Sequence, residues 1–245
     1  MDTLKLDPTD LVGVSFWIIS AAMVAATFFF WVERDRAVGK WKTSLTVAAM
    51  VTGIAAIHYF YMRGVWATTG ESPTVFRYVD WLLTVPLQII EFFLILSAIA
   101  IVRAGLFWKL LIASLVMLIA GYFGELNSGN GGMLWGLFAV GTLAWVYIIY
   151  EIFAGEASKI NAASGTMASK KAFNALRWIV TVGWAIYPLG YIFGYIGVGD
   201  NEATLNLIYN LADFINKIAF GVVIWAAATS EDSAALAREK KVVLD

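Results

Sequence analysis

The stretch that decides the fold is NLIYNLADFINK (residues 206–217), which lies within the long apolar segment 203–228 and ends in a lysine. Asp213 and Lys217 are four residues apart, so on a helix they share one face and can pair. A charged side chain at the centre of a bilayer costs about 2.5–3.5 kcal/mol on insertion scales, and ionisable residues in membrane helices usually mark functional sites. A buried lysine can also react with an aldehyde through its neutral, nucleophilic form. The alternative is a structural ion pair between helices.

The composition is that of an integral membrane protein. Of the 245 residues, 60% are hydrophobic and 14% are charged, whereas soluble domains carry about 25% charged residues. The net charge of −1 provides no basic surface for nucleic acid. The chain has no cysteine and a single histidine, His58. Disulfides, thiolate chemistry and multi-histidine metal sites are therefore excluded, and we expect no metal.

Seven apolar segments are long enough to cross a bilayer as helices. They are residues 11–32, 44–62, 74–101, 106–124, 133–153, 173–197 and 203–228. The links between them are short, and no internal repeat stands out. We therefore expect one membrane domain over residues 1–245, with a short outer segment 1–10 and a cytoplasmic tail 229–245.

Lysine and arginine set the orientation, because they concentrate in cytoplasmic loops. With the N-terminus outside, the inner loops and the tail hold 13 of the 17 basic residues. These are Arg34, Arg36, Lys40, Lys42, Arg103, Lys109, Lys159, Lys170, Lys171, Arg177, Arg238, Lys240 and Lys241. The sequence predicts an all-α, seven-transmembrane-helix bundle with its N-terminus outside and its C-terminus in the cytoplasm.

The third segment carries several charged residues within its apolar run. Asp80 and Thr84 are one helical turn apart, and Arg77 precedes Asp80 by one turn. Asp80 and Glu91 are 11 residues apart, so they share a helix stripe at an axial separation of about 16.5 Å. Acids on either side of a central basic group are what vectorial proton transfer requires. The alternative is a set of interhelical hydrogen bonds.

The sixth segment contains an aromatic stripe. Trp184, Tyr187, Pro188 and Tyr191 have offsets of 3, 4 and 7, which place them on one helix face. Such stripes usually serve packing. Opposite a buried lysine, this one could form a wall of a slot for a flat, apolar chromophore, with Trp81 as a second wall.

Three motifs carry a family resemblance. RYVDWLLTVPLQIIEF (77–92), GWAIYPLGY (183–191) and NLIYNLADFINK (206–217) resemble the microbial rhodopsins, and within them the proteorhodopsins. The resemblance extends over essentially all seven segments. It implies all-trans retinal bound to Lys217 as a protonated Schiff base, and a light-driven outward proton pump, which is an ion transporter rather than an enzyme. It also implies a multi-pass protein of the bacterial inner (plasma) membrane that forms a homo-oligomer, either a pentamer or a hexamer.

The resemblance assigns roles to the buried charges. Asp80 matches the primary counterion and proton acceptor, and Asp213 matches the second counterion. Arg77 completes the charge cluster, and Glu91 matches the cytoplasmic proton donor. Asp80, Thr84 and Glu91 together are the pattern of outward proton pumps. A sodium-pumping relative would have Asn in place of the acceptor, and sensory relatives usually lack the donor.

Further positions match residues that tune or enclose the chromophore. His58 is expected to hydrogen-bond Asp80, within or between protomers, so that the pKa of Asp80 depends on it. Gln88 matches a position at which Gln accompanies blue absorption and Leu green absorption. The expected retinal pocket comprises Trp81, Thr84, Trp184, Tyr187, Pro188, Tyr191 and Tyr209. Tyr59 is a weaker pocket candidate. Glu125 is interpreted as a solvated acid of an outer loop region, and the alternative is that it touches the proton exit path.

Two other functions stay open at this point. A sensory rhodopsin-type photoreceptor would bind retinal without net pumping, although Glu91 argues against it. A retinal-free seven-helix transporter or receptor would use the buried charges for a substrate, and it would be colourless. The expected partners are protons and the lipid bilayer.

Overall fold

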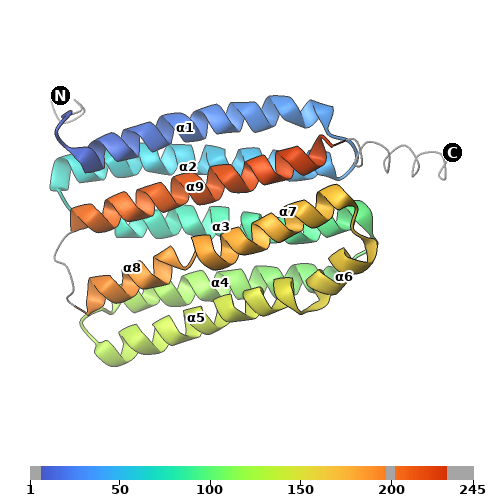
Figure 1. Cartoon of the computed structure of the whole chain (residues 1–245). Coiled ribbons are helices and arrows are strands. Elements are labelled where there is room, and N and C mark those ends of the chain that lie inside the picture. The colour runs from blue at the N-terminus through green and yellow to red at the C-terminus, as the bar shows by residue number, and fades with distance from the viewer. Residues whose placement is uncertain (1–6, 197–201, 231–245) are drawn as a thin grey trace.

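Seven membrane-length helical spans lie side by side in the computed structural model of the chain (Figure 1). The structure describes residues 7–196 and 202–230, and every regular element in these ranges is helical. The expected all-α bundle with seven spans is therefore confirmed. Residues 1–6, 197–201 and 231–245 lie outside the described part. Most of the expected cytoplasmic tail, with Arg238, Lys240 and Lys241, therefore lies outside the described residues.

The first helix is fixed at its start by a single carboxylate. α1 (Leu11–Glu33) begins after Asp10, whose side chain accepts a hydrogen bond from Gly13 N at 3.0 Å. This caps a backbone N–H that has no partner within the helix. The same carboxylate accepts a hydrogen bond from Trp66 Nε1 at 3.0 Å. Because Trp66 belongs to the second helix, Asp10 also ties the first two helices together.

The second helix, α2 (Trp41–Thr69), extends further than its apolar run. It continues through Arg63, a residue that hydropathy placed in the following link. It ends at Gly70, which has a φ of 69° and whose N–H donates to Trp66 O at 2.8 Å. A left-handed residue that closes the last turn in this way is usually glycine, because a side chain would be strained there.

The next three helices agree with the expected spans to within a few residues. They are α3 (Thr74–Ile99), α4 (Ala104–Leu126) and α5 (Gly131–Phe153). α3 packs between α2 and α4, and it is the most buried of the seven spans. This position shields its polar side chains from lipid, where they would be costly.

The sixth span differs most from expectation. The link before it contains a short helix, α6 (Glu156–Ser164), and the span begins early with α7 (Met167–Trp178). A π-helical turn, Ile179–Gly183, then interrupts the α-helix, which resumes as α8 (Ile186–Tyr195). Apolar periodicity does not reveal such a turn, since it adds one residue without changing the hydrophobicity.

Two side chains from other helices hold the π-helical turn. Trp145 Nε1 donates to Val180 O at 3.0 Å, and Asn216 Nδ2 donates to Gly183 O at 3.1 Å. A side chain at Gly183 would collide with the Asn216 amide, which explains the glycine. Within a bilayer, backbone groups released from a helix must find partners in the protein. These two bonds supply them beside Lys217.

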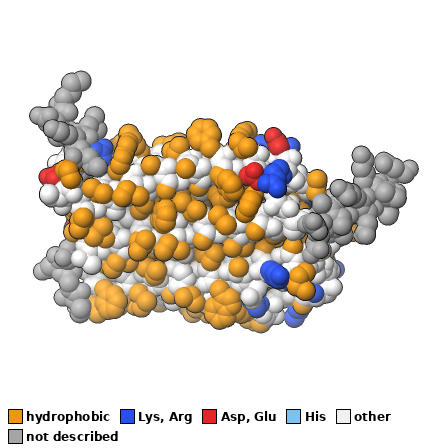
Figure 2. Space-filling model, turned by 45° about the horizontal axis from the view of Figure 1, so that its top comes forward, with side chains coloured by type: hydrophobic (Ala, Val, Ile, Leu, Met, Phe, Trp, Pro, Cys, Tyr) orange, Lys and Arg blue, Asp and Glu red, His pale blue; other side chains and the backbone are white. Residues whose placement is uncertain are grey.

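The last helix, α9 (Glu202–Ala228), closes the bundle. It packs against α1 and α2 on one side and against α7 and α8 on the other. Figure 2 shows a broad band of apolar side chains over the outer surface, with charged side chains toward the ends of the bundle. The band is the surface expected to face lipid acyl chains.

The capping role of Asp10 predicts a stability effect. Replacing Asp10 with Ala should lower the free energy of unfolding by about 1–3 kcal/mol, because an N-cap (roughly 0.5–2 kcal/mol) and a hydrogen bond to a charged group are lost together. Chemical unfolding in detergent, followed by circular dichroism, measures this. The control is Asp7→Ala, since Asp7 is exposed and its side chain bonds to the nearby Thr9 and not to α2 in the described part of the chain. Equal effects of the two substitutions would contradict the capping role.

Candidate functional site

Lys217 lies at the centre of the site, between two carboxylates. Its Nζ donates to Asp80 Oδ2 from α3 and, at 3.1 Å, to Asp213 Oδ2 one turn earlier on α9. The side chains of all three residues are at most 2% exposed. A buried charge is tolerated only when it is paired and hydrogen-bonded. One lysine between two aspartates leaves one negative charge to be balanced.

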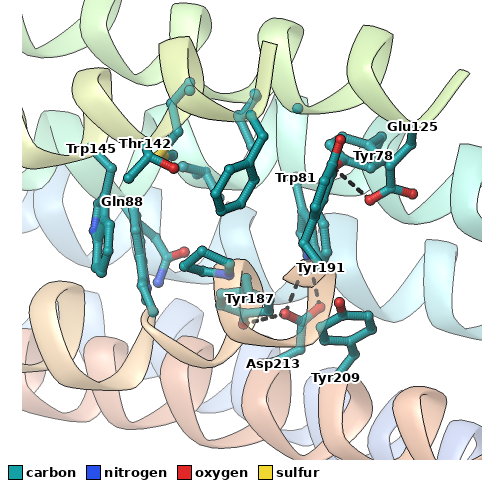
Figure 3. A pocket seen from close by; sticks show the side chains of 18 of the residues that line it. Tyr78, Trp81, Gln88, Glu125, Thr142, Trp145, Tyr187, Tyr191, Tyr209 and Asp213 are labelled. Atoms are coloured by element: carbon teal, nitrogen blue, oxygen red, sulfur yellow. Dashed lines mark hydrogen bonds between the residues drawn. The ribbon is translucent and has the colours of Figure 1, made fainter. Parts of the chain in front are cut away.

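The Asp213 carboxylate is fully supplied with hydrogen-bond donors. It accepts bonds from Tyr59 OH at 2.8 Å, from Tyr187 OH at 2.6 Å and from Trp81 Nε1 at 3.3 Å. These donors come from three different helices, and Figure 3 shows Asp213 with Tyr187 and Trp81. Several donors aimed at one carboxylate stabilise its charged form. The surroundings of Asp213 therefore favour a negative charge on it.

The Asp80 carboxylate is bound more loosely. Its Oδ2 accepts from Lys217, but its Oδ1 is buried and has no hydrogen-bond partner. A proton could be added to Oδ1 without breaking an existing bond. The two aspartates that share one lysine therefore differ in their hydrogen-bonding environments, and only Asp80 has an oxygen left without a partner among the described residues.

Arg77 supplies the balancing positive charge, although other side chains lie between it and the aspartates. Its Nη2 donates to Asn206 Oδ1 at 2.7 Å and to Asn210 Oδ1 at 3.0 Å. Its Nη1 donates to Tyr59 OH at 3.3 Å, and Tyr59 in turn donates to Asp213. Arg77 thus belongs to the buried charge group through a tyrosine, without a direct ion pair to either aspartate.

A cavity lies against Lys217 and Asp213. Its lining is mostly aromatic and apolar, with Trp145 and Gln88 toward one end and Tyr78 and Glu125 toward the other (Figure 3). Six of the seven residues expected to form a pocket line it: Trp81, Trp184, Tyr187, Pro188, Tyr191 and Tyr209. The seventh, Thr84, is not among the lining residues. Its hydroxyl donates to the backbone oxygen of Asp80 at 2.9 Å.

Gln88 faces the cavity from α3. Its side chain is buried, and its Nε2 lies 3.4 Å from the backbone oxygen of Asn216, the residue before Lys217. The amide dipole of Gln88 is therefore held against the α9 backbone at the residue before Lys217. Asn216 joins the same neighbourhood through its side chain, which also lies 3.4 Å from Tyr187 OH.

His58 is near Asp80 but is not hydrogen-bonded to it in this single chain. Its Nδ1 is 3.7 Å from Asp80 Oδ1 and 3.0 Å from the backbone oxygen of Ile54. The His58 side chain is 19% exposed, so part of the ring faces outward from the bundle. The distance suits an electrostatic contact with a protonated imidazole rather than a hydrogen bond.

Glu91 lies deeper along α3, apart from the Lys217 group. It is 1% exposed, and within the described part of the chain neither carboxylate oxygen has a hydrogen bond of regular geometry. Ser44 of α2 is the polar side chain that approaches it. A buried carboxyl group without partners avoids the large cost of an isolated charge by keeping a proton.

Glu125 corrects an expectation, because it is not a solvated loop acid. It belongs to α4, is only partly exposed, accepts a hydrogen bond from Tyr78 OH at 2.9 Å and lines the cavity. Hydropathy predicted that the fourth span ends at residue 124. The helix continues to Leu126 and therefore includes Glu125. The tyrosine that shields it is 47 residues away in sequence.

Two asparagines of α9 also have a structural role that the sequence patterns did not predict. Asn206 and Asn210 hold Arg77. Their spacing could have predicted this role. Residues 206, 210, 213 and 217 are separated by 4, 3 and 4 positions and therefore share one helix face.

Comparison with known proteins agrees with this arrangement. The family model described as bacteriorhodopsin-like protein matches residues 10–231. The chain is 58% identical over 232 residues to a green-light absorbing proteorhodopsin of Gamma-proteobacterium EBAC31A08, and 56% identical over 230 residues to a blue-light absorbing proteorhodopsin of Gamma-proteobacterium Hot 75m4. Each match covers 93% of this chain and 90% of the relative.

A solved structure gives the same result. The crystal structure of blue light-absorbing proteorhodopsin from Med12 superimposes with a TM-score of 0.76 at 59% identity. The match covers 89% of this chain and 98% of that one.

Proposed function

The chain belongs to the bacteriorhodopsin-like family, and from this premise we propose that it is a light-driven pump that moves protons outward across the bacterial inner membrane. The observation that carries the proposal is Lys217, buried between a loosely bound and a tightly bound aspartate at the edge of an aromatic cavity. This is the arrangement that a proton-transferring chromophore site requires.

The residues present fit all-trans retinal. The cavity is lined mostly by apolar and aromatic side chains with a few polar groups, as is usual for small-molecule sites. Its walls include Trp81, Trp145 and Trp184, and the Lys217 amine borders it. When bound, retinal would be joined to Lys217 Nζ as a protonated Schiff base, and it would supply visible absorption and a light-driven change of shape.

The protein side of the mechanism follows from the two aspartates. The proton held at the Lys217 nitrogen passes to Asp80, which has an unused oxygen. Asp213 keeps its charge because Tyr59, Tyr187 and Trp81 hold it. Asp80 therefore acts as acceptor and Asp213 as the permanent counterion, with Arg77 as the second positive charge.

Glu91 is proposed as the proton donor. It is on the side of Lys217 opposite to the start of α3, about 16.5 Å along the helix from Asp80. Because the carboxyl group lacks hydrogen-bond partners, it can hold a proton in the dark and return it to the Lys217 nitrogen. With the start of α3 facing outside, transfer from Glu91 to Lys217 to Asp80 is outward.

The orientation and the assembly remain parts of the proposal. Basic side chains of the described residues favour a cytoplasmic end where α1 finishes and α2 begins, which puts the N-terminus outside. We propose one retinal-binding domain over residues 1–245 and a homo-oligomeric ring, a pentamer or a hexamer. In such a ring the outward-facing side of His58 could meet a neighbouring protomer.

The absorption colour is proposed to be blue, on the basis of Gln88. The green-absorbing and blue-absorbing relatives are nearly equally similar, at 58% and 56% identity, so overall similarity does not decide. Excitation moves positive charge away from the Lys217 nitrogen. An amide dipole near that nitrogen that favours the dark charge distribution widens the energy gap.

Light-driven acidification tests the proposed function. Cells that express the chain and are supplied with retinal should acidify the medium in light, and a protonophore should abolish the change. Asp80→Asn should lower the initial rate by about 10²-fold or more, because a positioned proton acceptor is lost. Lys217→Ala should have no visible band. Asp35→Asn, at an exposed ion pair, is the matched control.

The pH of the assay separates pump from sensor. Below the pKa of Asp80 the acceptor is protonated before light arrives, so outward transport should stop at acidic pH and return at alkaline pH. A coloured protein that moves no protons at alkaline pH would be a photosensor, and the proposed function would be wrong.

The colour assignment predicts the effect of one substitution. Gln88→Leu removes the amide dipole near the Lys217 nitrogen and should shift the absorption band clearly to the red. Absorption spectra of the purified proteins measure this. Thr142→Val, at another polar residue of the cavity lining, is the control. An unmoved band in Gln88→Leu would eliminate Gln88 as the tuning residue.

The position of His58 predicts a change in titration. His58→Asn removes the imidazole 3.7 Å from Asp80, and the pH midpoint of the colour change should move by roughly half a unit or more, where one unit corresponds to about 1.4 kcal/mol. Spectra recorded against pH measure the midpoint. An unchanged midpoint would show that the two residues are not coupled.

A further inference from the structure

A continuous line of polar groups runs from Arg77 to the surface at the start of α9. Arg77 Nη2 donates to Asn206 Oδ1 at 2.7 Å, and Ser72 Oγ donates to the same oxygen at 3.4 Å. The backbone N–H of Ser72 then donates to Glu202 Oε2 at 2.9 Å. Glu202 is exposed, so the line ends at a carboxylate in contact with solvent.

The same line continues inward to the lysine. Arg77 Nη1 donates to Tyr59 OH at 3.3 Å, Tyr59 OH to Asp213 Oδ2 at 2.8 Å, and Lys217 Nζ to the same carboxylate at 3.1 Å. Each link is a hydrogen bond of ordinary or slightly long geometry. The buried charge group is therefore connected to one particular point on the surface.

Only one group beyond Arg77 on this line readily takes up and gives off a proton. Arginine stays protonated and the asparagine amide does not titrate, so these residues hold the line in place. Glu202 is a carboxylate and can do both. When Asp80 gains a proton, Arg77 faces one negative charge fewer, and its positive field favours the departure of a proton on its outer side.

We propose that Glu202 is the terminal proton acceptor of the outward path. The inference rests on the proposed function and goes beyond it, because it names the exit. The O–H bond of the Asp80 carboxylic acid breaks, and the proton travels outward and forms an O–H bond on a Glu202 oxygen. That bond then breaks to bulk water and restores the carboxylate. One proton leaves the protein for each proton that Asp80 received.

A competing exit is less well connected. Glu125 accepts a hydrogen bond from Tyr78, but Tyr78 meets Trp81 only through a ring contact, with centroids 5.2 Å apart. A ring contact does not transfer protons. The described hydrogen bonds do not join Glu125 to the buried aspartates on this side, whereas they join Asp213 to Glu202 through Tyr59, Arg77, Asn206 and Ser72.

Glu202→Gln is the decisive variant. Glutamine keeps an oxygen for the Ser72 N–H but cannot take up a proton, so the local structure is retained and the chemistry is lost. A pH-sensitive dye in the medium times proton release after a flash, and transient absorption times the transfer to Asp80. We expect release to slow about fivefold or more. Water replaces the carboxylate in part, so the delay is smaller than the roughly 10²–10⁴-fold of a positioned acid or base.

The transfer to Asp80 should be unchanged within about twofold, since a positioned acid or base affects mainly its own proton-transfer step. Formate in the medium, a small diffusible carboxylate, should restore fast release. Glu71→Gln is the matched control, because Glu71 is an exposed acid beside Ser72 that is not part of the line. It should release protons like the unmodified protein.

Infrared difference spectroscopy gives a readout that does not depend on transport. A carboxylic acid C=O band should appear transiently during release and be missing in Glu202→Gln. Normal release in Glu202→Gln, or the absence of such a band, would overturn the proposal. So would a delay that appears in Glu125→Gln instead. By contrast, an unmodified protein that moves no protons at alkaline pH would refute the proposed function itself.

Discussion

The ion group of Lys217, Asp80 and Asp213 is the interaction on which the rest of the structure depends. Charges in a medium of low dielectric constant must be paired and hydrogen-bonded, or they destabilise the fold. The two helices that carry them, α3 and α9, therefore lie within the bundle. Two other helices contribute to the same neighbourhood, since α2 supplies Tyr59 and α8 supplies Tyr187, and the aromatic cavity covers the remaining side.

The functional asymmetry of the site arises from an unequal distribution of donors. Asp213 has three neutral donors besides the lysine, whereas Asp80 has the lysine alone and an oxygen without a partner. Two chemically identical side chains thereby have different environments, which suit the two tasks proposed for them, a permanent charge and a proton carrier. The environment of each carboxylate, rather than its identity, sets the direction in which a proton can move.

Much of this could be predicted from the sequence, and the limits have physical causes. The seven spans follow from hydropathy, and the Asp213–Lys217 pair follows from its spacing of one turn. The contact of Lys217 with Asp80 spans 137 residues, and that of Tyr59 with Asp213 spans 154, so no local pattern contains them. The resemblance to a known family predicted the first contact. The π-helical turn and α6 stayed hidden because local hydrogen bonding, not apolar periodicity, defines them.

The π-helical turn at Ile179–Gly183 has a consequence for how the gene can change. A π-helical turn contains one residue more than an α-helical turn and absorbs that residue locally, so the helices on either side keep their rotation. Loss of a single codon within the turn would close it to a regular helix, and the carbonyls of Val180 and Gly183 would no longer be held open for Trp145 and Asn216. The sixth span can therefore lose one residue at this point with less disturbance to Trp184, Tyr187 and Pro188 than a deletion elsewhere in the span would cause.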